Sequence, residues 1–511
     1  MSTASRVAKN TMFLYGKMAI TVGISLYTTR LILGALGAAD FGIFNLVAGT
    51  IAMLGFLNAS MAVATVRFMA YAEGAGDRAL QREIFNVGFF IHLGLALLVG
   101  VVLYAAGHFF FNGFLKIPPG RLVAAHTVYY FMILSTMVTV MSVPYDAAIN
   151  ANEHFFLYAI VGVGQSLLTL SAALIVVHTM SDKLVTYGWL MASINVIVLA
   201  TYRIYCHRKY DECRINYRLY FKKAVFREMF SFSGWQFLTL SVQMVSMYGM
   251  GIVLNRFFGA LLNAAQGVAG QISGQLAAFS NTMIKALNPA IVKSEGAGDR
   301  QRMHRATMTG AKMSFFLNMM FFVPFIIEAD YILSIWLKHV PQWSVIFTKL
   351  VLVQTLIEAF STPLNSAINA EGHLKKVSLT RTMNYALLLP LIWLFFRLGY
   401  PPFAMWLVSI FIAATGLSIL MYFAHKQCGI TMWTYFLRTI TPCLAVFAVT
   451  AGPALIPHLL MGTGLARLIT VSFVFWSLFV IFVLYLGLDK QERRVIFRIV
   501  GNSLRRFNIK K

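Results

Sequence analysis

Four basic residues lie inside long apolar runs or near their ends, where a charge needs a specific role. Lys17 and Lys285 fall toward one expected membrane face, and Arg30 and Arg256 fall toward the other. A charge in hydrocarbon costs at least roughly 2.5–3.5 kcal/mol, so such residues face a hydrated interior or extend to the interface. Arginine binds phosphate through paired hydrogen bonds, and lysine supplies a point charge. The four cations therefore predict a site for an anionic substrate, with extension to the lipid headgroups as the alternative for each.

Two acidic residues are candidates for coupling transport to an ion. Glu358 lies deep in its apolar run, beside Gln354 one helical turn away, and such a carboxyl group is costly without a role or a partner. Asp146 lies near the expected end of its run beside Pro144, so capping or a loop role is the alternative there.

Polar side chains recur at helical spacing in five of the apolar runs. Residues three or four positions apart share one face of a helix, so each set forms a stripe. The stripes predict a hydrated cavity, and hydrogen bonding between helices is the alternative. They consist of Lys17, Thr21, Ser25 and Thr28; Ser135, Thr139, Ser142 and Asp146; Gln236, Thr239, Gln243 and Ser246; Gln271, Gln275, Thr282 and Lys285; and Gln354, Glu358, Ser361 and Asn365.

The elements that carry these residues are apolar segments long enough to cross a bilayer. The 511 residues are 59% hydrophobic and 12% charged, with a mean hydropathy of +0.72, which is typical of a polytopic membrane protein. The polar start leads into an apolar run that ends near Leu36, too long for a removable signal, so we expect a retained first span. We predict an all-α fold of about 14 spans, at 11–36, 42–64, 85–108, 123–148, 157–178, 184–203, 229–254, 261–285, 312–334, 345–367, 381–397, 402–423, 437–457 and 465–488.

An internal repeat divides the first twelve of these spans into two copies. The hexapeptide Glu-Gly-Ala-Gly-Asp-Arg occurs at 73–78 and again at 295–300. The segments 142–154 and 361–373 are identical at seven of thirteen positions. Six spans per copy is an even number, so the copies have the same orientation. We expect a six-helix bundle at 1–206, a basic linker at 207–228, a second bundle at 229–423, two further spans at 424–489, and a basic amphipathic tail at 490–511.

The net charge of +24 is an orientation signal. Most of the 42 Lys and Arg residues fall in loops on one side, which places both termini in the cytoplasm and argues against nucleic-acid binding. The four cysteines form no CxxC pair, and no metal-spaced cluster or phosphate-binding glycine loop occurs. We expect no cofactor, no metal and no enzyme activity.

The stretch 26–47, which contains Asp40-Phe41-Gly42, with Asn58, the segment 64–68 and the loop 73–77, resembles bacterial polysaccharide biosynthesis proteins. These are the Wzx-like oligosaccharide flippases of the MATE-related (MOP) superfamily, and the resemblance covers essentially the whole chain. It implies translocation of undecaprenyl-pyrophosphate-linked oligosaccharide across the bacterial cytoplasmic (inner) membrane by alternating access. It also implies partners: the lipid-linked substrate, membrane lipids, Na⁺ or H⁺ as a coupling ion, and other membrane proteins of polysaccharide assembly.

Three other functions are open to a chain of this kind. An ion-coupled exporter of small amphiphilic compounds should have a cavity dominated by acids and aromatic residues, and the cations count against it. A major-facilitator transporter should have a basic continuation after the loop at 74–78, which is missing. A membrane polymerase of polysaccharide synthesis should have a large external loop and no duplication.

Overall fold

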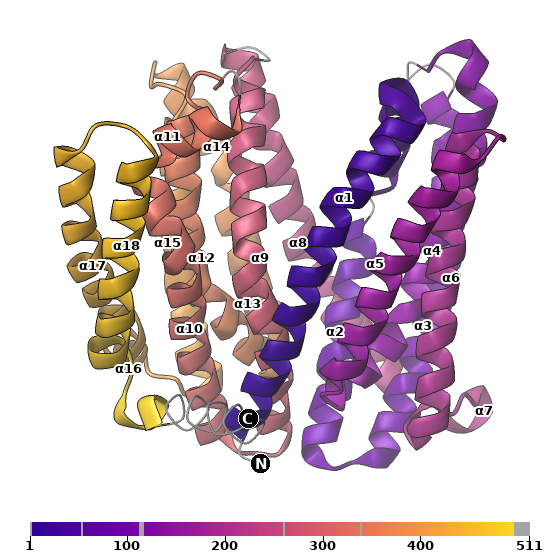
Figure 1. Ribbon diagram of the computed structural model, residues 1–511. Coiled ribbons are helices and arrows are strands. Elements are labelled where there is room, and N and C mark those ends of the chain that lie inside the picture. Colours follow the sequence, from indigo (N-terminus) through magenta and orange to yellow (C-terminus); the bar gives the residue numbers. More distant parts are fainter. Residues whose placement is uncertain (1–2, 53–54, 112–116, 259–260, 338–339, 495–511) are drawn as a thin grey trace, which may run out of the picture. The chain divides into compact units, whose positions relative to one another are not determined.

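The computed structural model describes residues 3–52, 55–111, 117–258, 261–337 and 340–494, and every regular element in them is a helix (Figure 1). Within these ranges, twelve helices are long and apolar enough to cross a membrane. The chain is therefore an all-α polytopic membrane protein, as its sequence predicts.

Two of the expected spans are not among the twelve. The span expected at 42–64 is shared between the end of α1 (Thr3–Ala52) and α2 (Gly55–Ala75), and residues 53–54 between them lie outside the described residues. The span expected at 261–285 lies in α9 (Leu261–Gly296), which is long enough, but Gln271, Gln275 and Lys285 reduce its hydropathy. Length and composition thus support twelve of the expected spans among the described residues.

Helix α1 is interrupted at Gly37. This residue has φ 74° and ψ 168°, a conformation that glycine adopts without the steric penalty of a side chain. The first membrane span accordingly runs from Met12 to Gly37, close to the predicted range of 11–36. The break separates this span from the remainder of α1, which carries Asp40.

The N-terminal unit comprises Asn10–Phe237. In it α4 contacts α2, α3 and α6, and α5 packs against α6. Buried residues such as Val99, Leu103 and Tyr129 form its core. Beyond α1 and α2, its helices are α3 (Arg78–Phe109), α4 (Leu122–Ala151), α5 (Phe155–His178), α6 (Lys183–Lys209) and the short α7 (Tyr217–Tyr220), with 3-10 turns η2 (Pro119–Arg121) and η3 (Asp211–Cys213).

The C-terminal unit comprises Leu238–Lys511 with Met1–Lys9, so the division between the units falls inside α8 (Lys223–Phe258). In this unit α12 contacts α9, α10 and α15, and α13 and α14 pack against α15. Its further helices are α10 (Arg300–Ile327), α11 (Ala329–Trp336), α12 (Ser344–Glu371), α13 (Leu374–Ala386), α14 (Leu388–Arg397), α15 (Ala404–Phe423), α16 (Met432–Tyr435), α17 (Thr441–Leu460) and α18 (Leu465–Phe482), with π-helical segments η4 (Ala424–Cys428), η5 (Phe436–Ile440) and η6 (Val483–Gly487).

The sequence repeat corresponds to a repeated packing pattern. Helices α2, α3, α4 and α6 contact one another in the same pairs as α9, α10, α12 and α15. The hexapeptide loops also match: Gly76 and Gly298 have φ of 70° and 72°, and the next residue caps the following helix. Asp77 accepts a hydrogen bond from the Leu80 amide at 2.9 Å, and Asp299 accepts one from the Arg302 amide at 3.0 Å. Each loop thus ends one helix and begins the next by the same means.

Two segments predicted to be non-membranous are partly described. The basic linker expected at 207–228 contains the end of α6, η3, α7 and the start of α8. The tail expected at 490–511 is helical as far as residue 494, and beyond that it lies outside the described residues.

Candidate functional site

A cavity of about 270 Å³ lies between α1, α5 and α6 of the N-terminal unit. Its described lining is mostly uncharged and polar, and it includes Ser25 and Thr28 of the stripe predicted on the first span. Phe41 and Tyr187 add aromatic surfaces. The described lining residues are Ile24, Ser25, Thr28, Thr29, Ile32, Phe41, Gln165, Ser166, Thr169 and Tyr187.

Several polar side chains of this lining can still form hydrogen bonds with a ligand. The Thr28 hydroxyl is buried, and no partner is found for it among the described residues. Ser166 and Thr169 donate to the backbone carbonyls of Gly162 and Gln165, at 3.1 and 2.8 Å, so their oxygens can still accept. A ligand rich in hydroxyl groups would match this set of neutral donors and acceptors, and its apolar faces could lie on the aromatic rings.

Lys17 lies at the same α1–α5 contact, on the N-terminal side of the cavity. Its ammonium group is 4.1 Å from the centre of the Tyr158 ring, a cation–π contact. Its side chain passes directly over Gly162, where an added Cβ would be 2.1 Å from Lys17 Cε. Lys17 and Ser25 are about 12 Å apart along a helix that rises 1.5 Å per residue. Thr21, between them, donates its hydroxyl to the Met18 carbonyl at 3.1 Å.

The other predicted cavity residues belong to the C-terminal unit or are not described. The side chain of Arg30 lies outside the described residues. Arg256 is exposed in the last turn of α8, and Lys285 is half-buried in α9. Three predicted lining amides are exposed on their helices: Gln243 on α8, and Gln271 and Gln275 on α9.

Glu358 has neighbours that the sequence pattern only partly indicates. It lies exposed at the middle of α12 and accepts a hydrogen bond from Gln354 Nε2 at 2.8 Å. Arg381 of α13 interacts with it electrostatically and donates to Asn365 Oδ1 at 2.6 Å. Glu358, Arg381 and Asn365 thus form a polar cluster between α12 and α13, and Arg381 is the member that sequence reasoning missed.

Asp146 lies inside a helix and does not cap one. Helix α4 continues through Pro144 as far as Ala151, which rules out the capping and loop roles considered from the sequence. Its carboxylate accepts a hydrogen bond from Asn150 Nδ2 at 3.1 Å, and the same amide nitrogen donates to the Asp146 carbonyl at 2.9 Å.

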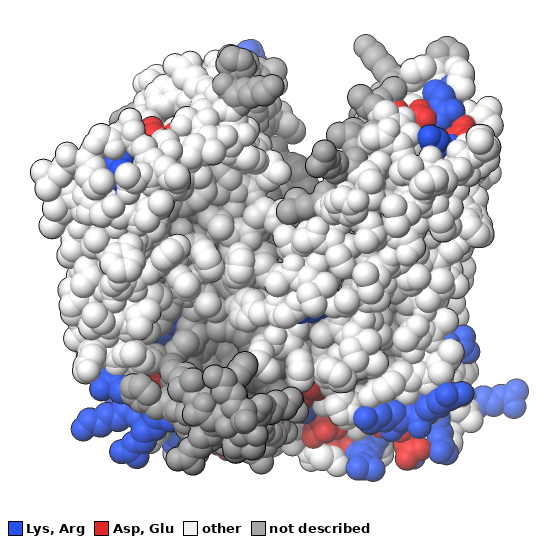
Figure 2. All heavy atoms as spheres, viewed as in Figure 1, with Lys and Arg blue, Asp and Glu red and all other residues white. Residues whose placement is uncertain are grey.

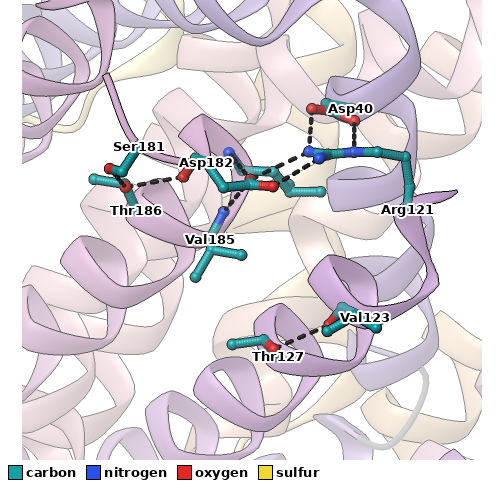
Figure 3. A network of polar contacts seen from close by, with 9 residues as sticks. Asp40, Arg121, Val123, Thr127, Ser181, Asp182, Val185 and Thr186 are labelled. Carbon is teal, nitrogen blue, oxygen red and sulfur yellow. Dashed lines mark hydrogen bonds and ion pairs between the residues drawn. The ribbon is translucent and has the colours of Figure 1, made fainter. Parts of the chain in front are cut away.

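Arg121 joins two acidic residues of the N-terminal unit (Figure 3). It donates to Asp40 through Nε at 2.8 Å and Nη2 at 2.5 Å, and to Asp182 through Nη1 at 2.6 Å. Asp40 follows the break in α1, Arg121 precedes α4, and Asp182 caps α6. The network therefore connects the segment after the Gly37 break to the starts of α4 and α6.

Arg121 and Asp182 lie outside the membrane spans, and each stabilises the charged form of the other. The hydrogen bonds that Arg121 donates to Asp182 and Asp40 raise the pKa of Arg121. Burial alone would raise the pKa of Asp182, but Arg121 and the amides of Val185 and Leu184 bring it below its ordinary value of 3.8. The carboxylate form of Asp182 is therefore the form that this contact favours.

Replacing Arg121 by glutamine should destabilise the N-terminal unit by about 1–2 kcal/mol, because two carboxylates would remain together without their cation. A thermal melt of the purified protein measures this, and Arg121→Lys should restore only part of the loss because an ammonium group lacks the forked geometry. The folded-state pKa of Asp182 is lowered, so its contribution is present above about pH 4 and disappears as the pH falls through that pKa. An unchanged melting temperature at pH 7 would contradict the role of the network.

A second missed cluster is centred on Glu328, between α10 and α11. This carboxylate is fully buried and accepts hydrogen bonds from Arg467 of α18 at 2.8 Å and from His458 of α17 at 2.8 Å. Helices α17 and α18 pack against each other and against α10. The cluster thus attaches the last two spans to the bundle of the C-terminal unit.

Arg67 of α2 is a further cation, and it belongs to none of the polar stripes predicted from the sequence. It is 7% exposed, and its guanidinium lies 4.4 Å from the Phe68 ring centre, 5.1 Å from that of Tyr71 and 5.4 Å from that of Phe232. Its signal in the sequence was a basic residue among aromatic ones, a pattern that also suits an ordinary interfacial segment.

Solved structures that are similar to the chain include MATE transporters and a further transporter of the MOP superfamily. A multidrug resistance MATE family transporter of the MOP superfamily in an outward-facing conformation is similar over 84% of this chain and 96% of its own, with a TM-score of 0.73 and 12% identity. MATE in complex with MaD3S has a TM-score of 0.74 at 12% identity, over 84% and 97% of the two chains. A MOP superfamily transporter from Pyrococcus furiosus has a TM-score of 0.67 at 14% identity, over 84% and 96%.

No protein-family model and no curated protein sequence matches the chain. The likeness to solved structures therefore defines the fold, which is that of the MATE transporters in the MOP superfamily.

Proposed function

We propose that the protein is a transporter that flips undecaprenyl-pyrophosphate-linked oligosaccharide across the bacterial cytoplasmic membrane by alternating access. The observation that carries the proposal is the placement of Lys17 at the same α1–α5 contact as a cavity with a neutral, hydroxyl-rich lining. A lipid-linked oligosaccharide has a phosphate group next to sugar rings. Lys17 would bind the phosphate, and the cavity about 12 Å further along α1 would hold sugar hydroxyls.

The alternative is an ion-coupled exporter of small amphiphilic compounds. It is favoured by the likeness to a multidrug resistance MATE transporter and by the exposed carboxylate of Glu358. The neutral lining of the N-terminal cavity offers a cation no carboxylate among its described residues. The Pyrococcus furiosus transporter with this fold is described as having a binding pocket of reverse polarity that suggests a different function. That description supports the view that this fold can carry substrates of different charge.

The orientation is part of the proposal. In Figure 2 the blue side chains gather mainly at one end of each unit, the end that carries the hexapeptide loops. The positive-inside rule would place that end, and both termini, in the cytoplasm.

Transport by the purified protein in liposomes tests the proposal. A short-chain polyprenyl-pyrophosphate oligosaccharide and a cationic dye are offered separately, and transfer of each is followed with and without Na⁺ and pH gradients. We expect transfer of the glycolipid, and the combination of Thr28→Val with Gln165→Leu should reduce it because both remove polar groups from the cavity lining.

The matched control is Thr127→Val, on α4. The Thr127 hydroxyl is exposed, donates to the Val123 carbonyl at 2.9 Å and does not belong to the described lining of the cavity (Figure 3). Movement of the dye without movement of the glycolipid would reject the flippase and support the exporter.

A further inference from the structure

A second cavity, of about 560 Å³, lies in the C-terminal unit next to the last two spans. Three segments form its walls: the start of α10, the junction of η5 with α17, and the end of η6 with the chain that follows it. Both η5 and η6 are π-helical, an uncommon conformation that often occurs at functional sites. The lining residues are Arg305, Met308, Thr309, Lys312, Leu437, Arg438, Pro442, Leu486, Gly487, Leu488, Asp489, Gln491 and Glu492.

The acidic residues of this cavity are already engaged within the protein. Glu492 forms an ion pair with the buried Lys312 and accepts a hydrogen bond from Thr309 Oγ1 at 2.7 Å. Asp489 Oδ1 accepts hydrogen bonds from the amides of Gln491 and Glu492, both at 2.8 Å. The ion pair cancels the charges of Glu492 and Lys312, whereas the amide hydrogen bonds hold the Asp489 carboxylate in place and leave it negative. The positive charge of the cavity therefore comes from other residues.

Two arginines supply that charge. Arg305 comes from α10 and Arg438 from η5, both are exposed, and neither has a hydrogen bond or ion pair in the part of the chain that the structure describes. The two guanidinium groups come from different walls of the cavity, and each can donate paired hydrogen bonds to two oxygens of a phosphate group.

Part of the lining is apolar. Leu437 and Leu486 are 44% and 47% exposed, and Met308 and Pro442 lie beside them in the lining. Trp433, 69% exposed, precedes η5 by one turn, and tryptophan is enriched at membrane–water interfaces. A free phosphate ion gains nothing from such walls, whereas a phospholipid presents an anionic headgroup and acyl chains together.

We propose that this cavity binds the headgroup of an anionic phospholipid, through Arg305 and Arg438, at the bilayer surface beside the last two spans. The bound lipid contacts α10 and the η5–α17 junction at once, so it strengthens the attachment of this pair to the bundle. The site is independent of the substrate that the transporter carries.

Lipid binding to the full-length protein in detergent tests the site. Retention of phosphatidylglycerol and of phosphatidylcholine is measured by native mass spectrometry, with inorganic phosphate as a competitor. The double variant Arg305→Gln/Arg438→Gln should lower the affinity for phosphatidylglycerol about tenfold or more and leave phosphatidylcholine unaffected.

The matched control is Lys490→Gln/Arg494→Gln, which removes two exposed cations near the cavity that do not line it. It should keep the preference for phosphatidylglycerol. An equal loss in both double variants would overturn the site, as would displacement of the lipid by millimolar inorganic phosphate. If the arginine double variant cannot be purified, the two single variants decide, and an unaltered lipid preference in both would reject the proposal.

Discussion

Replacing Glu328 by glutamine is expected to lower the free energy of unfolding of the C-terminal unit by about 3–5 kcal/mol. The glutamine keeps the size of the side chain but not its charge. Arg467, which is 6% exposed, would then be a buried cation without its carboxylate, and the hydrogen bond from His458 would weaken. Removal of one partner from a buried pair is costly because the other remains desolvated and unpaired.

Thermal unfolding in detergent measures the loss, and reaction of Cys443 shows where it occurs. Cys443 is buried at the start of α17, so it should become reactive when the last two spans separate from the bundle. Asp330→Asn is the matched control, only two residues away. Asp330 pairs with Lys349 at 3.1 Å but is 63% exposed, and a surface pair of this kind contributes about 1 kcal/mol or less.

The double variant Glu328→Leu/Arg467→Leu distinguishes the cost of an unpaired buried charge from the contribution of the ion pair itself. Removal of both charges leaves no unpaired ion, so most of the lost stability should return. Equal effects of Glu328→Gln and Asp330→Asn would show that the buried cluster does not hold the last two spans.

The fold was largely predictable because its signals are local. Apolar runs set the helices, and the repeated hexapeptide marks equivalent loops, in which Asp77 and Asp299 cap equivalent helices. The polar stripe of α1 also indicated a hydrated surface, and Ser25 and Thr28 do line a cavity. Apolar and polar periodicity within single helices, together with one repeated motif, was enough for these predictions.

The ion pairs were not predictable, because their partners are far apart in the sequence. Arg121 is 81 residues from Asp40, and Arg467 is 139 residues from Glu328. Hydropathy places Arg121 just before the span expected at 123–148 and Arg467 at the start of the span expected at 465–488, and it names no partner for either. The contacts that distinguish them arise only when helices pack. The end of the first span was predicted at residue 36, next to the observed break at Gly37, but the connection expected at 37–41 is helical apart from the φ of 74° at Gly37.

Replacing Lys17 and Lys285 together by alanine is expected to reduce glycolipid transfer about 100-fold or more, while the protein still inserts and folds. Each lysine would contribute a charge-assisted contact to the substrate phosphate, worth about 1.5–3 kcal/mol, and every 1.4 kcal/mol is about a factor of ten. The measurement is the initial rate of glycolipid transfer in liposomes, together with the amount of surface polysaccharide in cells whose only copy of the protein is the variant.

The matched control is Lys209→Ala with Lys349→Ala, which also removes one lysine from each unit. Lys209 lies 5.4 Å from the Tyr205 ring centre, a cation–π contact like that of Lys17 with Tyr158, but at the end of α6 away from the cavity lining. The two double variants therefore lose the same net charge, and each removes one lysine that contacts a tyrosine ring. If the positive charge itself binds the phosphate, Lys17→Arg/Lys285→Arg should retain much of the rate, since arginine also binds phosphate. Loss of transport in the control, or full transport in the alanine variant, would exclude these lysines from the substrate path and leave the neutral cavity as the remaining candidate for recognition.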